Sequence, residues 1–230
     1  MTTSTVLKKI LIGTAGAVFI TGFAVQEKAV AVGITVLNSG FESPHVSSYT
    51  TNDITSWQAS PNPGSSVGVF NITGSTSFNQ GAPEGSQVAY SNGGTISQTV
   101  SANLAANTTY TLSLDVGSRN DIPFPGYNVE LLAGNTVLAS GNSVTPAPGT
   151  FAPISVTYTT SSSDALLGQP LTIGLLGNNG GQTEFDNVTL NATSTPVPFE
   201  FSPGLGILAL GALAATAQFK SQVQKWKLKT

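Results

Sequence analysis

Apolar and polar residues alternate in short runs through the middle of the chain, and no sustained helical period appears among them. In residues 110–116 (YTLSLDV) every second side chain is large and apolar, which is the pattern of a strand with one buried face. Residues 154–159 (ISVTYT) and 171–176 (LTIGLL) repeat the pattern, and turn residues such as Asn92-Gly93-Gly94 separate the runs. The pattern predicts an all-β fold, an antiparallel jelly-roll β-sandwich over residues 32–192.

The N-terminal segment has the three parts of a secretory signal peptide. Lys8 and Lys9 precede an apolar run at residues 10–25, and the small residues Ala29 and Ala31 fit the rule for a cleavage site. An uncleaved anchor is the alternative, but sixteen residues that include three glycines are short for a stable span. We therefore expect a signal helix, cleavage after Ala31 (residues 1–31 removed) and export of the body.

The C-terminal segment carries a second apolar run. Residues 201–219 contain no charged side chain, and at about 1.5 Å per residue a helix there spans roughly 28 Å, close to the thickness of a hydrocarbon core. This predicts a transmembrane-type helix. The lysines that follow would hold the C-terminus in the cytoplasm; they are Lys220, Lys225, Lys227 and Lys229.

The residues before this run form a short motif: Val197, Pro198, Phe199 and Glu200. Motif, apolar helix and basic tail together, in residues 193–230, resemble the PEP-CTERM class of bacterial sorting signals, in the Pro-Phe-Glu variant of cyanobacteria. The resemblance implies that an exosortase-type membrane protease is the partner and cuts near the motif. The alternative is a single-pass membrane protein that keeps its anchor.

Charge and composition exclude several classes of function. Between residues 33 and 196 the only cation is Arg119, against nine acidic residues, so the body should repel nucleic acid. The chain has no cysteine and one histidine, His45, which excludes thiolate chemistry and metal sites built from cysteines or several histidines.

Asp186 is the acidic residue with the clearest structural consequence. It shares strand parity with Val188 and Leu190, so it is expected to point toward the core with them. A buried lone carboxylate is costly unless it is paired or coordinated. Arg119 and a calcium ion are two ways to satisfy it, and hydrogen bonds from backbone N–H groups are a third.

The order of motifs in the body carries a second resemblance. Residues 37–44 (LNSGFESP) open the body, residues 83–119 follow, and residues 185–190 (FDNVTL) close it. This order is similar to the galactose-binding-like jelly roll shared by many carbohydrate-binding modules. The resemblance implies a structural calcium site that joins Glu42 in the opening turn to Asp186 in the closing strand.

Aromatic residues in expected loops are the candidates for ligand contact: Tyr49, Phe124 and Tyr127. Trp57 is expected to fill the core instead. Glu84, Glu130 and Glu184 lie in no recognisable catalytic motif, and no Gly-x-Ser-x-Gly elbow is present.

The sequence thus predicts a non-catalytic, exported cell-surface or matrix protein with polysaccharide as the expected ligand. A structural or adhesive envelope protein is the alternative, and an enzyme is the third hypothesis.

Overall fold

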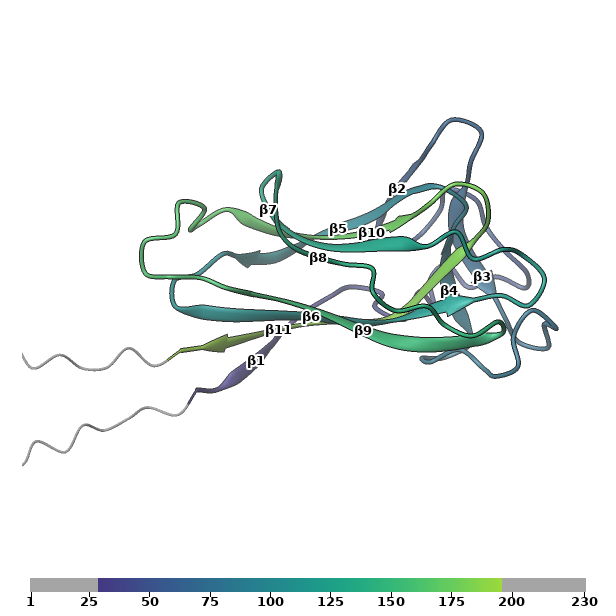
Figure 1. The fold of residues 1–230 in the computed structure, drawn as a ribbon, viewed down its shortest axis with the longest axis horizontal. Coiled ribbons are helices and arrows are strands. Elements are labelled where there is room, and N and C mark those ends of the chain that lie inside the picture. Colours follow the sequence, from purple (N-terminus) through teal and green to yellow (C-terminus); the bar gives the residue numbers. More distant parts are fainter. Residues whose placement is uncertain (1–28, 196–230) are drawn as a thin grey trace, which may run out of the picture. The chain divides into compact units, whose positions relative to one another are not determined.

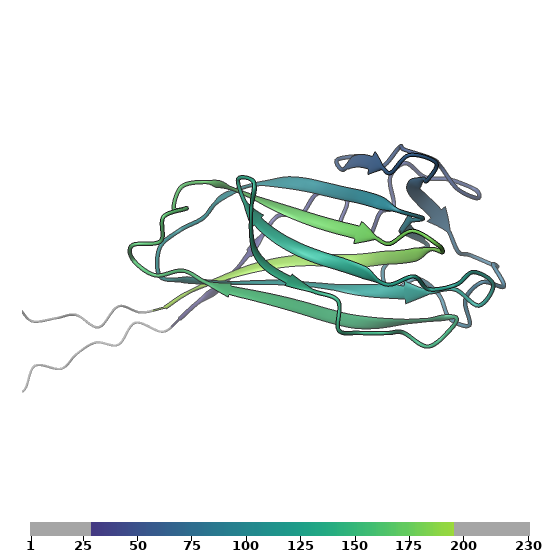
Figure 2. The same ribbon diagram turned by 45° about the horizontal axis from the view of Figure 1, so that its top comes forward.

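The computed structural model describes residues 29–195, which fold into two antiparallel β-sheets packed face to face (Figures 1 and 2). Residues 29–195 contain no helix. The prediction of an all-β sandwich with antiparallel strands is therefore confirmed. Both predicted terminal helices, and the motif Val197–Glu200, lie outside the described residues.

The two sheets share the strands almost equally. The first has the order β3-β4-β11-β6-β9, with β1 paired to the far half of β11, and the second has the order β2-β5-β10-β7-β8. The first sheet comprises β1 (Ala31–Ile34), β3 (Val67–Asn71), β4 (Gln87–Ser91), β6 (Thr108–Ser118), β9 (Thr150–Thr159) and β11 (Thr183–Ser194). The second comprises β2 (Gln58–Pro61), β5 (Gly94–Asn103), β7 (Tyr127–Ala133), β8 (Thr136–Gly141) and β10 (Pro170–Gly177).

The main core lies between the sheets and follows the alternation read from the sequence. On β6 the side chains of Tyr110, Leu112 and Leu114 are at most 3% exposed, while the residues between them face outward. Trp57 also belongs to this core and packs against Phe41 with ring centroids 5.1 Å apart. Apolar burial of this kind supplies most of the stabilisation of a sandwich.

A bulge in β11 reverses the direction of its side chains. Phe185, Val188 and Leu190 all belong to the main core, and the register against β6 shifts between Asp186 and Thr189. Asn187 takes a positive φ of 54° at this point. The expected burial of Asp186 is confirmed, but its side chain does not point the same way as Val188, because the extra residue changes the parity between them.

A long connection covers the outer face of the first sheet. Residues 72–86, between β3 and β4, lie over this face and bring Phe78 against it. A second, smaller apolar cluster forms there from Ile72, Phe78 and Val88, with Phe70, Ala82 and Phe151 packed around it. Side chains on this outer face of β11 are consequently buried although they do not belong to the main core.

Candidate active site

Two acidic side chains lie buried on the outer face of β11, two residues apart. Glu184 and Asp186 are both 0% exposed. Glu184 is paired across the sheet with Tyr90 of β4 on one side and Gly117 of β6 on the other. Asp186 is paired with Asp115 of β6.

The side chain of Glu184 has no hydrogen-bond partner. Both carboxyl oxygens are fully buried and neither accepts nor donates a hydrogen bond. Burial raises the pKa of Glu184 to about 8; the charge of Arg119 opposes this rise and the charge of Asp121 adds to it. The carboxyl group is therefore largely protonated at neutral pH, which makes it a proton donor.

The ring of Phe151 lies close to Gly117, the β6 residue paired with Glu184, because glycine leaves space for it. A β-carbon added to Gly117 would lie 2.5 Å from Cε1 of Phe151 and 3.0 Å from Cβ of Glu184. Phe151 in turn stacks on Phe78, with centroids 4.7 Å apart and ring planes 16° apart. The surroundings of Glu184 are thus apolar on this side, which is the cause of its raised pKa.

Arg119 is the cationic side chain whose charge acts on Glu184. Its Nε and Nη2 donate to the carboxylate of Asp121 at 2.9 and 2.7 Å, and Nη1 donates to Oε1 of Gln182 at 2.6 Å. Nη2 also donates to Oγ of Ser77 at 2.9 Å, and the guanidinium lies 5.0 Å from the ring centre of Phe70. Hydrogen bonds from Arg119 lower the pKa of Asp121 to about 2.

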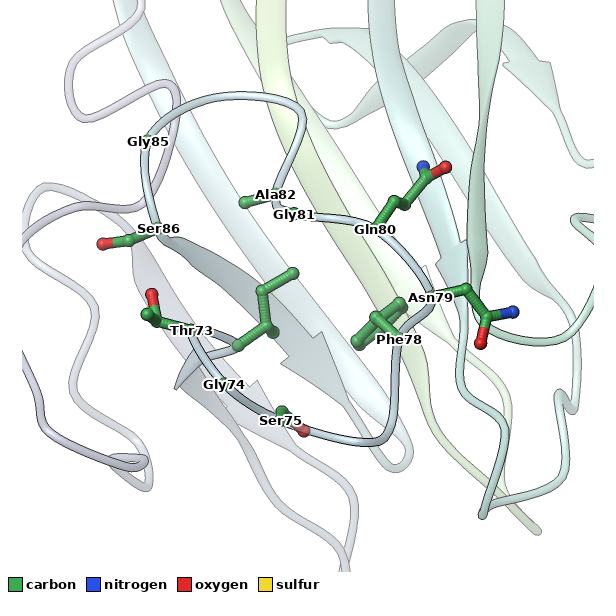
Figure 3. Close-up of a pocket in the computed structure, with 11 residues that line it drawn as sticks. Thr73, Gly74, Ser75, Phe78, Asn79, Gln80, Gly81, Ala82, Gly85 and Ser86 are labelled. Atoms are coloured by element: carbon green, nitrogen blue, oxygen red, sulfur yellow. The ribbon is translucent and has the colours of Figure 1, made fainter.

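Two surface cavities flank this region. The first, of about 390 Å³, is enclosed by residues 72–86, and Figure 3 shows the Phe78 side chain pointing into the space that the loop surrounds. The second, of about 500 Å³, is lined in part by Arg119, Asp121 and Phe124. Glu184 itself is fully buried and lines neither cavity.

The residues predicted to bind calcium come close to the same short segment. Oε1 of Glu42 accepts hydrogen bonds from the backbone N–H groups of Ser86 and Gln87, each at 2.7 Å. Oδ2 of Asp186 accepts from the backbone N–H of Glu84 at 2.8 Å. Residues 29–195 contain no cluster of three or more acidic or histidine side chains at metal-binding spacing. Calcium at this place stays a prediction.

The aromatic residues predicted to contact a ligand are not gathered at one place. Tyr49 is 66% exposed and forms an isolated bridge with Phe70. Tyr127 is only 2% exposed and belongs to the main core, while Phe124 packs near it with centroids 6.0 Å apart. Ligand contact by these residues is not tested and stays a prediction.

Sequence reasoning did not single out Glu184. The available signal was the spacing of Gln182, Glu184 and Asp186, three polar residues with one parity, the last two on β11 on either side of the apolar Phe185. Such a spacing indicates a polar face that something must cover. It does not show what covers it, since residues 72–86 are distant in sequence.

Comparison with known proteins identifies the family of this chain. The family model HpiC1-like (HpiC1 cyclase) matches residues 32–191. The chain belongs to the HpiC1-like cyclase family. A Stig cyclase, Fisc from Fischerella sp. TAU, solved with (3Z)-3-(1-methyl-2-pyrrolidinylidene)-3H-indole, is 34% identical, and the match covers 73% of this chain and 100% of that chain with a TM-score of 0.67.

Other matches vary widely in strength. A Fischerella sp. TAU cyclase solved with 4-(1H-indol-3-yl)butan-2-one is 34% identical over 72% of this chain and 98% of that chain, with a TM-score of 0.66. The carbohydrate-binding module TmCBM61, solved with β-1,4-galactotriose, is 16% identical over 68% and 97%, and its TM-score of 0.46 carries no argument about ligands. Comparison with curated proteins gave no match.

The family corrects several expectations from the sequence. The match to a cyclase family over residues 32–191 shows that identification as a non-catalytic PEP-CTERM sorting protein, with an exosortase as partner, is wrong. Membrane association through residues 201–219 is likewise unsupported: those residues lie outside the described part, and no helix within residues 29–195 is long and apolar enough to cross a membrane. The incorrect identification rested on a short terminal motif, Val197–Glu200, and not on residues of the β-sandwich.

Proposed function

We propose that this protein is a cyclase that closes a ring in a small, indole-bearing molecule, with Glu184 as the proton donor. The observation that carries the proposal is the buried carboxyl group of Glu184, which has no hydrogen-bond partner and a pKa of about 8. Membership of a cyclase family supports ring closure as the reaction class. The indole-containing ligands of the two Fischerella structures support the substrate class.

The proposed step conserves atoms and charge. Glu184 transfers its proton to an electron-rich double bond of the substrate, which leaves a carbocation and a carboxylate. A second π-system in the same molecule attacks the cation and forms the new ring bond. A proton is then lost to the carboxylate, so product and substrate are isomers.

The apolar surroundings suit this chemistry. A cation formed near Phe151 would face an aromatic ring rather than water. Water that entered the site could trap the cation, so a sealed position for Glu184 protects the intermediate.

An isomerisation assay tests the proposal. Wild-type protein, supplied with indole-bearing substrates that also carry an alkene, should yield a product of unchanged mass and new retention time. Glu184→Gln should lose this product. Glu130→Gln is the matched control, because Glu130 lies on β7 of the other sheet. Equal product from wild type and Glu184→Gln would contradict the assignment.

We also propose a structural calcium ion near Asp186 and Glu42. Burial raises the pKa of Asp186 to about 8, and the negative charges of Glu84 and Asp115 add to this effect. Arg119, the only lysine or arginine in residues 29–195, is engaged with Asp121, so a bound cation is the remaining source of positive charge. Carboxylate and carbonyl oxygens are the ligands that calcium prefers. Calcium should raise the melting temperature of chelator-treated protein, and Asp186→Ala should remove that increase.

We assign jelly-roll connectivity to the sandwich. From β4 to β11 the chain changes sheet at every connection except the hairpin between β7 and β8. The inner strands then follow the orders β4-β11-β6-β9 and β5-β10-β7-β8, as expected for a double-sheet jelly roll.

We further propose that the protein is exported and works outside the cytoplasm after cleavage at Ala31. The signal-like N-terminus supports this location. Intact-mass measurement on protein from its native host should show Val32 as the first residue, and a retained N-terminus would contradict it.

A further inference from the structure

Residues 72–86 lie over the outer face of the first sheet, the face on which Glu184 is buried. Glu184 is 0% exposed, and Phe78 from this segment lies against Phe151, which flanks Gly117 together with Glu184. If Glu184 donates a proton to a substrate, as proposed above, this segment has to move. The inference below rests on that proposed function.

Phe78 and Phe151 form a flat aromatic contact. The near-parallel planes, 16° apart, and the centroid distance of 4.7 Å describe one ring lying on another. Phe151 is held by β9, whereas Phe78 belongs to a connection. The planar face of Phe151 is therefore a surface on a strand that a ring from a connection covers, and an indole ring has the shape to take the same place.

The covering segment has few apolar contacts and a polar tether. Its cluster contains three buried apolar residues, far fewer than the main core. The tether joins Asn79 and Asn120: the backbone N–H of Asn120 donates to the carbonyl of Ser77 at 2.9 Å, and Nδ2 of Asn120 donates to Oδ1 of Asn79 at 3.0 Å. The N–H of Asn79 also donates to the carbonyl of Gly149 at 2.9 Å. The side-chain bond between the exposed residues Asn79 and Asn120 opens at little cost in free energy. The segment is also held at Ser77 by Arg119 and at Glu84 by Asp186.

The segment also has room to move. The cavity of about 390 Å³ that it encloses borders Phe78 directly (Figure 3). Gly74 has a φ of +73°, and a β-carbon added to Gly74 or Gly81 would contact nothing within 4 Å. The chain thus has a glycine in open surroundings on each side of Phe78.

We propose that the face of Phe151 is the subsite for the aromatic ring of the substrate, and that Phe78 occupies this subsite until the substrate displaces it. Phe78 then acts as an internal competitor of the ligand. Removal of the Phe78 side chain increases the fraction of protein with a free subsite. The apparent affinity for the ligand then rises by the same factor as this fraction.

Binding of an indolyl ketone, 4-(1H-indol-3-yl)butan-2-one, measured by calorimetry tests this without any catalytic step. Phe78→Ala should bind the ketone several-fold more tightly than wild type. Phe151→Ala should bind it about three- to tenfold more weakly, because the stacking surface is lost. Val137→Ala, an exposed side chain on β8 in the other sheet, should bind as wild type does.

The outcomes separate the two proposals. Binding to Phe78→Ala that is equal to or weaker than binding to wild type, when wild type binds, overturns the Phe78 inference and leaves the cyclase proposal intact. Absence of binding by both proteins overturns the indole substrate class and the inference with it. If Phe78→Ala binds the ketone and wild type does not, the inference is supported.

A measurement on wild-type protein covers the case in which the variants are unstable. The amide protons of Asn79 and Asn120 should exchange with deuterium faster in the presence of the ketone, because ligand displaces the segment. Unchanged or slower exchange of both amides in ligand-saturated protein would overturn the inference.

Discussion

Glu184 and Asp186 stand two residues apart on one face of one strand, yet their surroundings differ. Both are fully buried, and burial raises both pKa values to about 8. Asp186 accepts backbone hydrogen bonds from Glu84 and Asn187, whereas Glu184 has no partner. A satisfied carboxyl group holds the chain together, and an unsatisfied one is free to exchange a proton with a ligand.

The largest expected effect separates the two acids by activity. Glu184→Gln should lower the rate of ring closure about 100- to 10,000-fold, the contribution of a positioned general acid, while the fold stays intact. The rate should be measured as kcat/KM for product formation, with circular dichroism as the control for folding. A decrease in kcat/KM of equal size in Asp186→Asn, with its fold intact, would contradict the assignment of different roles to the two acids.

Asp186→Ala should instead lower stability. It leaves the part-buried N–H group of Glu84 without its acceptor, which costs about 0.5–1.5 kcal/mol, or a decrease in melting temperature of about 1–6 °C. Thermal unfolding in a chelator measures this without any effect of calcium. Glu184→Ala is the informative comparison, because it removes no hydrogen bond. A greater loss of stability in Asp186→Ala supports the distinction, and an equal loss contradicts it.

The pH dependence of stability should show both acids. Their pKa values are higher in the folded than in the unfolded protein, so the folded state binds more protons between about pH 4.5 and pH 8. Stability should be highest at the acidic end of this window and fall by a few kcal/mol as pH rises to 8. Chemical denaturation in chelator at several pH values tests this, and Glu184→Gln should remove the part due to Glu184. A rise in stability over this window would contradict the raised values.

The smallest effect concerns Asp121. This side chain is half exposed, so loss of its ion pair with Arg119 in Asp121→Asn should cost at most about 1 kcal/mol. Its negative charge raises the pKa of Glu184, and its removal should lower that pKa. Because the protonated acid is the active form, the alkaline limb of the pH–rate profile should move to lower pH. An alkaline limb at higher pH in Asp121→Asn than in wild type would contradict the expected decrease in the pKa of Glu184.

The sequence was sufficient for the sandwich but not for the site. Alternation in residues such as Tyr110, Leu112 and Leu114 predicts strands, because a strand exposes its side chains on two faces in turn. The direction of Asp186 could not be predicted, since the bulge at Asn187 adds one residue that no local pattern reveals.

The site depends on contacts between distant segments. Phe151 lies beside Gly117, the β6 partner of Glu184, and Phe78 stacks on Phe151. The charge of Arg119, from another part of the chain, acts on the carboxyl group. A glutamate outside any catalytic motif gives no sign of this in the sequence. The terminal motif at Val197–Glu200 was more conspicuous and directed the interpretation to sorting, although activity is a property of the folded body.

Direct titration of Glu184 tests the central claim. The side-chain carboxyl carbon should be followed by carbon-13 NMR in chelator-treated protein from pH 4 to 10, with Glu184→Gln used to assign its resonance. We expect a midpoint near pH 8, which means that the group carries its proton at neutral pH. A midpoint near the ordinary glutamate value of about 4.3 would show an ionised carboxylate and would contradict the role of Glu184 as proton donor.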